Sequence, residues 1–275
     1  MTKTWLITGT SSGFGKELAT VVAQQADTQL VATARQLSDL AYLDAFDAHR
    51  IAKVALDVTQ PDQVTAAVAE AKQRFGKIDV LVNNAGLGYF STIEESEMAQ
   101  VRHLFDVNVF GLATVTQAVL PIMRAQRAGI IVNLSSALAL TTLATMGFYS
   151  ATKYAVEGYS DTLRQEVADL GIQVMTVEPS GARTDWAGRS SQKVAPQLAD
   201  YATFSAGITD VPSSVTDAPG DPHKIAQVIY TQANQATVPH HLPLGDFAYD
   251  GGLANLRGLI SEITSREALS RSTDD

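Results

Sequence analysis

Short apolar runs alternate with longer stretches of helical periodicity along much of the chain. The runs are apolar throughout rather than at every second position, which is typical of strands covered on both faces. Apolar residues between the runs recur at helical spacing, and Pro61 marks the start of one helix. The predicted strands lie at residues 5–8, 30–33, 54–56, 80–82, 130–134 and 174–177, and the clearest helices at 61–75, 101–124 and 147–163.

This alternation predicts an α/β fold, a doubly wound parallel sheet of the Rossmann-like kind with helices on both faces. We find no repeat or linker that would divide residues 1–275, so we expect a single domain. The alternation stops after Pro179, and residues 184–222 are rich in Ser, Gly, Pro, Asp and Ala. A long irregular segment of this kind is typical of a lid or a mobile loop over a site.

Regular secondary structure is predicted again from residue 222. We expect a helix from Pro222 to about Asn234, a short strand-like piece at residues 241–245 and a C-terminal helix.

Composition narrows the classes of function. The chain is 45% hydrophobic and 18% charged, as in ordinary globular proteins, and its formal net charge of -9 argues against nucleic acid or an anionic membrane as the main partner. It has no cysteine, which excludes disulfides, thiolate catalysis and cysteine-ligated metal, and we expect no metal site. We see no signal-peptide pattern and no apolar run of about 20 residues, so we expect a cytoplasmic protein.

Polar and glycine-rich clusters follow the predicted strands. In a parallel sheet the carboxyl ends of the strands meet at one edge, where ligands bind. Packing alone gives no reason for such residues to gather there. The clusters are 8-TGTSSGFG-15, Arg35, Asp57, 83-NNAG-86, 135-SS-136 and 178-EPSG-181.

The first cluster, 8-TGTSSGFG-15, has glycines at Gly9, Gly13 and Gly15. Glycines allow the backbone to approach a pyrophosphate closely, and the N–H groups at a helix start bind an anion. A plain strand-to-helix turn is the alternative, because Gly and Ser are common in turns. The position directly after the first strand favours a phosphate-binding turn.

The residues after the second strand bear on the choice of cofactor. A site that reads a free ribose diol usually has an acidic residue here. This chain has Ala34 and Arg35, and the nearest acid is Asp39. A guanidinium suits a ribose 2'-phosphate, although a lone arginine is more often a solvated surface residue. We therefore expect NADP(H) to be favoured over NAD(H).

The next clusters are weak signals one at a time. Asp57 with Val58, and Asn84 with Ala85 and Gly86, consist of residue types that are common in turns. Asp57 is placed to bind an adenine amino group, and the asparagine to stabilise the sheet edge. Their weight comes from their combination.

Tyr149 and Lys153 are spaced i, i+4, so they share one face of the predicted helix. Random placement gives about 0.2 such pairs in a chain of this composition, and this is the only one. A nearby ammonium is expected to lower the pKa of a phenol towards neutrality, where a general acid or base works best. Ser136, thirteen residues upstream, is placed to donate to a carbonyl oxygen. Asn108 is a polar residue among apolar ones, and the simplest expectation is a side chain bonded to its own helix.

Together these motifs resemble the short-chain dehydrogenase/reductase family from Thr4 to about Gly188. The segments 177-VEPSGARTDWAG-188 and 265-SREALSRSTDD-275 look most like a subgroup related to the 17β-hydroxysteroid dehydrogenases. The resemblance implies that Tyr149 is the general acid/base, that Lys153 lowers its pKa and binds the nicotinamide ribose, that Ser136 orients the substrate and that Asn108 holds a water. The implied cofactor contacts are Gly9, Ser11, Ser12, Gly13, Phe14, Gly15, Arg35, Asp57, Val58, Asn84, Ala85, Gly86, Tyr149, Lys153, Pro179, Gly181 and Thr184.

One position departs from the family pattern. The family usually has Pro-Gly after the sixth strand, whereas this chain has Pro179-Ser180 followed by Gly181. We expect a slightly different loop here.

The segments expected to form the substrate pocket are apolar. They are residues 87–90, residues 138–146, and the lid with Trp186, Tyr201 and Phe204. Their composition favours an uncharged ketone, aldehyde or secondary alcohol, although these side chains also suit simple packing of the lid.

Two other functions remain open at this point. A non-catalytic NADP(H)-binding sensor or scaffold has no need of Asn108, Ser136, Tyr149 and Lys153 together, and a sugar-nucleotide epimerase would need a larger C-terminal domain. The resemblance also implies a homodimer or homotetramer built on the two long helices, in which Tyr154 and Tyr159 are packing or interface residues.

Overall fold

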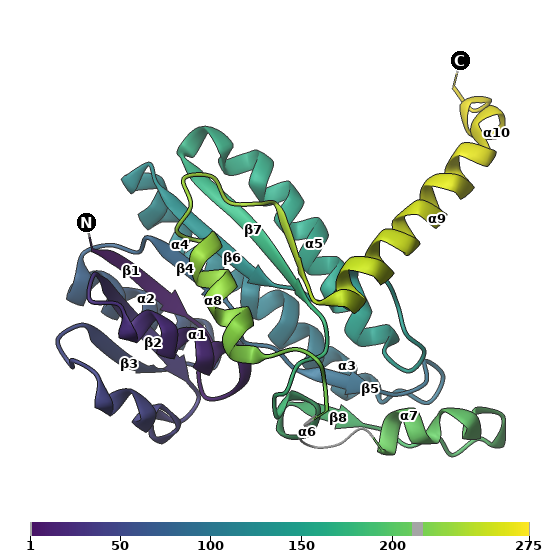
Figure 1. The fold of residues 1–275 in the computed structure, drawn as a ribbon, viewed down its shortest axis with the longest axis horizontal. Helices are drawn as coiled ribbons and strands as arrows, with labels where there is room; N and C mark the ends of the chain where they lie inside the picture. Colours follow the sequence, from purple (N-terminus) through teal and green to yellow (C-terminus); the bar gives the residue numbers. More distant parts are fainter. Residues whose placement is uncertain (1, 211–216, 275) are drawn as a thin grey trace.

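The computed structural model describes residues 2–210 and 217–274 and is built on a seven-stranded parallel sheet (Figure 1). The strand order is β3-β2-β1-β4-β6-β7-β9, so the direction of chain progression reverses between β1 and β4. Such a reversal opens a crevice at the carboxyl ends of the two strands. The strands are β1 (Lys3–Ile7), β2 (Thr28–Ala34), β3 (Ile51–Ala55), β4 (Val80–Asn83), β6 (Gly129–Leu134), β7 (Ile172–Pro179) and β9 (His241–Leu244).

Helices cover both faces of this sheet. α1 (Gly13–Gln24) and α8 (Pro222–Gln232) pack against one face, and α2 (Pro61–Phe75), α4 (Leu112–Gln126) and α5 (Gly147–Val167) against the other (Figure 1). Alternate strand residues supply the two cores: Trp5 and Ile7 face one, and Leu6 faces the other. The predicted doubly wound α/β fold is confirmed.

The predicted elements correspond closely to the observed ones, and their ends have local causes. α2 begins with Pro61, whose fixed φ suits a first helical turn, and it ends at Gly76, which has φ 77°. β3 begins three residues before the predicted strand at 54–56. Asp221 caps the start of α8, and its Oδ1 accepts hydrogen bonds from the N–H groups of His223 and Lys224.

The predicted helix at 101–124 is a longer helical stretch with an irregular middle. α3 (Met98–Phe105) passes through the π-helical turn η2 (Asp106–Gly111) into α4. Within the described chain this stretch is long and apolar enough, at mean hydropathy 1.3, to cross a membrane by length and composition alone. The expectation that the chain contains nothing of this kind is therefore wrong. In the fold, Val115 and Val119 are buried in the core beneath the sheet.

The segment at 184–222 is more regular than predicted. It contains α6 (Trp186–Arg189), β8 (Ser191–Lys193), the 3-10 helix η5 (Ala199–Phe204) and α7 (Ser205–Thr209), whereas residues 211–216 lie outside the described residues. β8 pairs in parallel with β5 (Gly88–Phe90), which follows the end of β4. Paired backbone therefore holds this segment beside the sheet edge.

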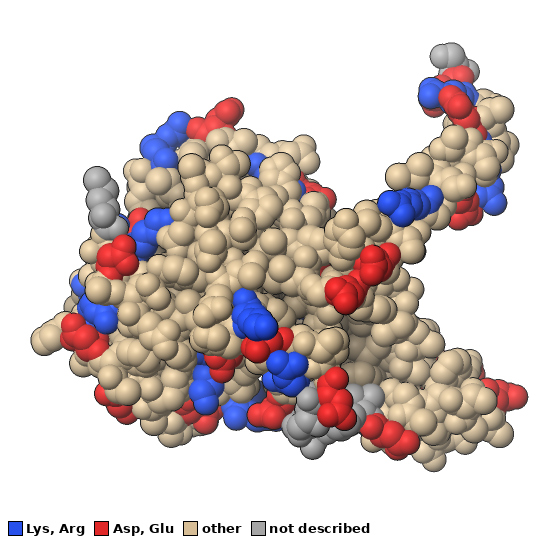
Figure 2. Space-filling model, viewed as in Figure 1, with Lys and Arg blue, Asp and Glu red and all other residues tan. Residues whose placement is uncertain are grey.

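The remaining elements are short or lie at the end of the chain. α9 (Gly252–Ser265) and α10 (Glu267–Arg271) project away from the body, as the yellow ribbon in Figure 1 shows. Charged side chains of both signs are interspersed over the face in Figure 2. The other short turns are η1 (Leu37–Ala45), η3 (Ala137–Ala139), η4 (Ala168–Leu170) and the π-helical η6 (Phe247–Gly251).

A buried chain of polar side chains ties the centre of the sheet to α4 and α5. Asn83 Nδ2 donates to Thr116 Oγ1 at 2.9 Å and to Asn133 Oδ1 at 2.8 Å, and Asn133 Nδ2 donates to Ser160 Oγ at 2.8 Å. Asn133, Thr116 and Ser160 are fully buried. Each member depends on its neighbour, because water cannot replace a lost partner there.

Replacing Asn133 with leucine is therefore expected to lower the free energy of unfolding by about 2–3 kcal/mol, since Asn83 and Ser160 each lose a partner. Denaturant unfolding measures the change. The matched control is Asn234→Leu, at an exposed position just after α8, which should stay within about 0.5 kcal/mol of the parent protein. Equal effects of the two substitutions would contradict a structural role for this chain of side chains.

Candidate active site

A cavity of about 470 Å³ opens at the carboxyl ends of the strands. It brings together nearly all the residues singled out in the sequence. Gly15 and Asn108 lie behind its wall and do not line it. The predicted residues that do line it are Gly9, Ser11, Ser12, Gly13, Phe14, Arg35, Asp57, Val58, Asn84, Ala85, Gly86, Ser136, Tyr149, Lys153, Pro179, Gly181 and Thr184.

The glycine-rich turn is held against the end of β4. Thr8 Oγ1 accepts hydrogen bonds from the N–H groups of Asn84 and Ala85, each at 3.0 Å. Asn84 Nδ2 in turn donates to the carbonyl oxygens of Thr8 and Gly9 at 2.8 and 2.9 Å. Gly9 has φ 69°, and a Cβ at this position would lie 2.9 Å from Ala85 Cα. The turn therefore requires glycine for both its conformation and its close packing.

The start of α1 is arranged to bind an anion. Among the described residues, no side chain caps this helix at Ser12, so its first N–H groups remain available. Gly13 has φ 55°, and a Cβ there would meet nothing closer than Thr184 at 3.8 Å. Gly15 is close-packed instead, since its Cβ would collide with Asn84 Nδ2 and Gly9 O. Gly13 thus leaves room beside the helix start, and Gly15 allows the helix to seat against the sheet.

Arg35 lies at the end of β2, is exposed and lines the cavity. Asp39, the nearest acid, pairs with Arg189 at 3.2 Å, and Arg189 Nη2 also donates to Ser11 Oγ at 3.1 Å. Two guanidinium groups therefore lie near the glycine-rich turn. Arg189 could not be found from local sequence signals, because it is 150 residues away from Asp39 along the chain.

Asp57 has a local structural role as well as a place in the cavity wall. Its Oδ1 accepts from the Thr59 N–H at 2.9 Å and from the Thr59 hydroxyl at 2.7 Å. Its own N–H donates to Gln63 Oε1 at 2.8 Å. These bonds fix the turn that leads into α2.

Tyr149 and Lys153 lie one turn apart on α5 and are both buried, with 7% and 6% of their surface exposed. Lys153 Nζ is 5.6 Å from the centroid of the Tyr149 ring and donates a 2.8 Å hydrogen bond to the Leu134 carbonyl at the end of β6. Ser136 follows the same strand, and its Oγ accepts from the Leu138 N–H at 3.1 Å. The end of β6 therefore positions the serine and anchors the lysine.

Burial shifts the pKa values of both groups towards their neutral forms. It raises the pKa of Tyr149 to about 12, against a smaller lowering by a hydrogen bond with Ser136. It lowers the pKa of Lys153 to about 8, against the opposing effect of the Glu157 charge. The expected lowering of the tyrosine pKa is therefore wrong for this structure, because desolvation of the phenolate outweighs the hydrogen bond with Ser136.

Asn108 is buried in the π-helical turn η2, a type of irregularity that is frequent at functional sites. The sequence suggested that its side chain would bond to its own helix, but in the structure the side chain bonds to other segments. Oδ1 accepts from the Leu87 N–H at 2.7 Å, and Nδ2 donates to the Leu87 carbonyl at 2.9 Å and to Thr152 Oγ1 at 3.1 Å. Asn108 thus fixes the segment after β4 against α5, next to Lys153.

The other end of the cavity is apolar. Trp186 packs edge-on against Tyr149, with ring centroids 5.0 Å apart, and Phe90 and Leu138 belong to the same cluster. The predicted segments 87–90 and 138–146 contribute Leu87, Phe90, Leu138, Leu143 and Met146 to the cavity lining. The sequence interpretation missed His103 and Phe247, which also line the cavity.

Tyr201 and Phe204 do not line the cavity, and this correction removes two residues from the expected pocket. Their rings lie 6.4 Å apart, and the Tyr201 hydroxyl donates to Glu94 Oε2 at 2.6 Å. They stabilise the outer part of the segment after β8 instead.

Ser180 gives the departure from Pro-Gly a structural explanation. Its Oγ accepts a 2.8 Å hydrogen bond from the Ala248 N–H, and a Cβ on Gly245 would lie 2.8 Å from this oxygen. Ala248 is in η6, next to Phe247. A serine here therefore ties the C-terminal segment to the end of β7 and holds Phe247 at the cavity.

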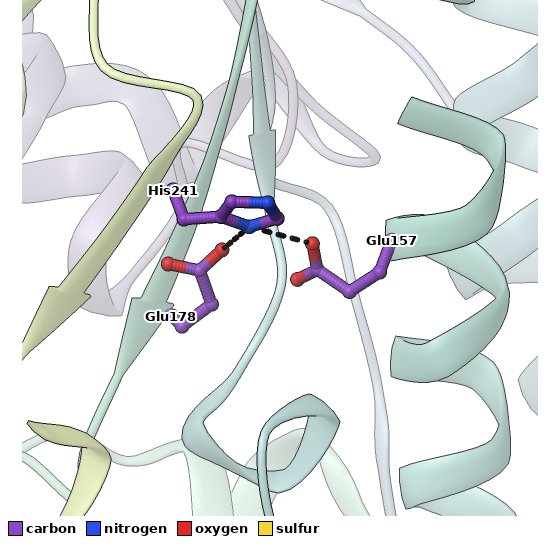
Figure 3. A group of neighbouring side chains, drawn as sticks. All are labelled: Glu157, Glu178 and His241. Atoms are coloured by element: carbon purple, nitrogen blue, oxygen red, sulfur yellow. Dashed lines mark hydrogen bonds and ion pairs between the residues drawn. The ribbon is translucent and has the colours of Figure 1, made fainter. Parts of the chain in front are cut away.

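Between α5, β7 and β9 lies a cluster of titratable groups, Glu157, Glu178 and His241 (Figure 3). His241 Nδ1 lies 3.2 Å from Glu178 Oε1 and 3.4 Å from Glu157 Oε2. Glu178 also accepts hydrogen bonds from Thr176 Oγ1 and from the Leu242 N–H. Burial, together with the negative charge of Glu178, raises the pKa of Glu157 to about 7. No local sequence pattern indicates this cluster, because its members come from α5, β7 and β9.

Comparison with known proteins identifies the family. Residues 3–195 match the short chain dehydrogenase family, and the chain belongs to it. An oxidoreductase, BOA17 of Botryotinia fuckeliana, is 36% identical over 91% of this chain and 91% of its own length. A 3-ketodihydrosphingosine reductase of Bacteroides thetaiotaomicron is 36% identical over 72% of this chain and 71% of its own. The protein is thus an oxidoreductase of this family.

Solved structures show the same fold. A short-chain dehydrogenase from Streptomyces avermitilis has a TM-score of 0.90 at 36% identity, with all of both chains covered. ElxO with NADP bound has a TM-score of 0.73 at 27% identity, covering 89% of this chain and 97% of its own. A family member from Burkholderia phymatum in complex with NAD has a TM-score of 0.79 at 26% identity, covering 97% and 95%.

The carboxyl cluster generates a prediction about pH. The pKa of Glu157 in the folded protein, about 7, lies above its ordinary 4.5. The folded state therefore binds more protons between these values, and stability falls as the pH rises from about 4.5 to about 7. Glu157→Gln carries no ionisable group, so above pH 7 it is expected to be more stable than the parent by on the order of 2 kcal/mol.

Denaturant unfolding between pH 4.5 and pH 8 measures this effect. Glu166→Gln, an exposed substitution on the same helix, serves as the control and should follow the parent protein at each pH. A Glu157→Gln variant with an unchanged pH dependence would show that Glu157 titrates normally.

Proposed function

We propose that this protein is an NADP(H)-dependent oxidoreductase that interconverts an apolar ketone or aldehyde and the corresponding alcohol. One observation carries the proposal: Ser136, Tyr149 and Lys153 line the same cavity as the glycine-rich turn. The residues fit a dinucleotide, because Gly9 and Gly13 have left-handed backbone conformations and the start of α1 has no side-chain cap. A bound nicotinamide supplies the hydride equivalent that reaches the substrate carbon.

The protein's own groups manage the oxygen and the proton. In the reductive direction the hydroxyls of Ser136 and Tyr149 hydrogen-bond the substrate carbonyl and stabilise the negative charge that develops on its oxygen. Tyr149 then gives its proton to that oxygen. In the oxidative direction the phenolate takes the proton back, in accordance with microscopic reversibility.

The two shifted pKa values suit these roles. Tyr149, with a pKa of about 12, keeps its proton at neutral pH and is ready to act as an acid. Lys153, with a pKa of about 8, is charged at neutral pH and offsets the phenolate charge after proton transfer. Asn108 keeps the segment at Leu87 in place. The resemblance to the short-chain dehydrogenase/reductase family implies that it also holds a water of the proton relay.

The preference for NADP(H) rests on the adenosine end of the cavity. Arg35 follows β2, Arg189 is bonded to Ser11, and the acid Asp39 is already paired with Arg189. Positive charge favours a 2'-phosphate over a ribose diol. The related structures bind NADP in one case and NAD in the other, so the proposal rests on the residues of this chain.

The apolar lining supports an uncharged substrate. Phe90, Leu138, Leu143, Met146 and Trp186 line the cavity together with Tyr149, and all of them except Leu143 pack in one cluster with it. A relative is named as a reductase of a ketone, 3-ketodihydrosphingosine. The likeness to the 17β-hydroxysteroid dehydrogenases points to the same general class of substrate.

The setting in the cell is part of the proposal. We infer a small-molecule partner rather than nucleic acid or an anionic membrane, because the net charge of -9 favours neither of these two. A cytoplasmic location is proposed because the N-terminal sequence has no signal-peptide pattern. A homodimer or homotetramer through the long helices is supported by Phe110 and Tyr154, which are 60% and 43% exposed.

Replacing Tyr149 with phenylalanine removes the proton donor while keeping the ring that packs against Trp186. We expect turnover of apolar ketones to fall about 100- to 10,000-fold, with NADPH affinity within about threefold of the parent. Loss of NADPH absorbance measures turnover, and NADPH fluorescence measures binding. Tyr154→Phe on the same helix is the matched control and should stay fully active. Full activity in Tyr149→Phe would refute the mechanism.

Arg35→Ala is expected to weaken NADPH binding about tenfold and to leave NADH binding nearly unchanged, because only NADPH has the 2'-phosphate. Titration of nucleotide fluorescence with both cofactors measures the two affinities. Arg124→Ala, on α4 and outside the cavity lining, controls for loss of a positive charge. A parent protein that prefers NADH, with the preference unchanged in Arg35→Ala, would overturn the choice of cofactor.

A further inference from the structure

The C-terminal arm, which we define as α9 and α10, stands away from the rest of the chain (Figures 1 and 2). Gly252, its first residue, is the buried one in α9, and α10 contains none. The root is fixed, because Asn255 Nδ2 donates to the Leu140 carbonyl at 2.9 Å and a Cβ on Gly252 would touch Leu140. Beyond the root, a Cβ on Gly258 would meet nothing within 4 Å.

This arm carries an apolar seam on one side. Leu253, Leu256, Ile260 and Ile263 are spaced 3-4-3, as along the contact line of a helix pair, and Leu259 lies beside them. Leu256 and Leu259 are 45% and 50% exposed, and Ile260 and Ile263 are 63% and 59% exposed. Neighbouring apolar side chains of this size are rarely left in water together.

The arm also needs support to remain helical. α9 has 14 residues and contains Gly258, and an isolated helix of that length is marginal in water. Burial of the seam against another helix would supply the missing stabilisation. The described body of the chain offers it no partner beyond the root, so the partner must come from outside this chain.

We propose that the seam pairs with the same seam of a second copy of this chain, as two antiparallel helices related by a two-fold axis. We place the two-fold axis between Leu259 and Ile260. Leu259 of one copy then faces Ile260 of the other, and the reverse. Leu256 then lies opposite Ile263, so apolar residues meet from residue 256 to residue 263, whereas Leu253 near the root comes opposite Arg266.

The charges are complementary in the same register. Arg257 comes opposite Glu262 of the second copy, twice per pair because of the symmetry. Within one helix these two residues are five positions apart and do not pair with each other. Glu262 Oε1 accepts from Arg266 Nη1 at 2.6 Å in its own arm, but the carboxylate is exposed and has further acceptor positions for Arg257 of the second copy. Because one helix carries both charges of the pair, an identical helix matches it. The pattern therefore favours a second copy of this chain as the partner over an unrelated protein whose surface is only basic or only acidic.

A membrane surface fits the arm less well. Helices that lie on membranes carry several basic residues on their polar face. The polar positions of α9 include Asn255, Ser261, Glu262 and Ser265, with Arg257 as its one basic residue. This pairing also uses elements other than α4 and α5, so it does not depend on contacts between the long helices or on the proposed reaction.

The first test places a charge on the seam. Sedimentation velocity over a range of concentrations should show that Ile260→Glu raises the dissociation constant of one association step at least about tenfold. The matched control is Ser261→Glu, one residue away on the other side of the helix, which should remain within about threefold of the parent. Equal behaviour of the two variants, or a parent protein that is monomeric throughout, would overturn the proposal.

The second test addresses the register. Arg257→Glu and Glu262→Arg should each weaken association, and the double variant should recover most of the loss, because the opposed charges are exchanged together. Association that stays weak in the double variant would contradict the proposed register.

The third test uses the absence of cysteine from the chain. Leu259→Cys lies at the proposed axis and should form a covalent dimer under mild oxidation, whereas Ser261→Cys should not, because disulfides need Cα atoms within about 7 Å. Equal cross-linking of the two would contradict the pairing. Recruitment to anionic lipid vesicles without cross-linking at residue 259 would assign the seam to a membrane and overturn the proposal.

Discussion

The tie between the glycine-rich turn and the end of β4 is the constraint on which the candidate site depends. Thr8 and Asn84 exchange hydrogen bonds where β1 and β4 lie side by side and the direction of the sheet reverses. This contact fixes Gly9 in its left-handed conformation and sets the start of α1 facing the crevice. It also places Gly86 beside α5, where a Cβ would lie 3.8 Å from Lys153 Nζ. The glycine-rich turn and the Tyr149–Lys153 part of the cavity are thereby joined through one short segment.

Burial determines the chemistry of the groups that this constraint brings together. Tyr149 and Lys153 are both enclosed, and desolvation moves both of their pKa values towards the neutral forms. A phenol that keeps its proton and an ammonium that is close to releasing one are suited to passing a proton through the site. Glu157 opposes the shift of Lys153, so the cluster behind α5 influences the lysine without lining the cavity.

A hydrogen bond from Ala248 to Ser180 attaches the C-terminal segment to the end of β7. Ser180 stands where the family usually has glycine, and its hydroxyl bonds the backbone of Ala248. This bond lies next to Phe247, which lines the cavity, and the arm begins at Gly252 a few residues further on. The proposed substrate pocket and the proposed pairing surface therefore involve the same C-terminal segment.

Much of this arrangement could be predicted from local sequence signals. Strands such as β6 and β7 are apolar runs with turn residues at their ends, and their periodicity does not depend on distant contacts. Tyr149 and Lys153 were recognisable because helical spacing alone places them on one face. The residues that line the cavity at the strand ends could be predicted, because all the carboxyl ends of a parallel sheet lie at the same edge.

What the sequence determined by itself was the order of elements, the parallel sheet and the set of residues gathered at its edge, because these depend on periodicity and short spacing. Only the tertiary structure decided the direction of the Tyr149 pKa shift, the contacts of Asn108 with Leu87, the pairing of Arg189 with Asp39 and the exclusion of Tyr201 and Phe204 from the cavity. Each of these depends on burial or on contact between segments far apart in the chain. Desolvation and long-range packing have no local signature in sequence, since they arise only when the whole chain is folded.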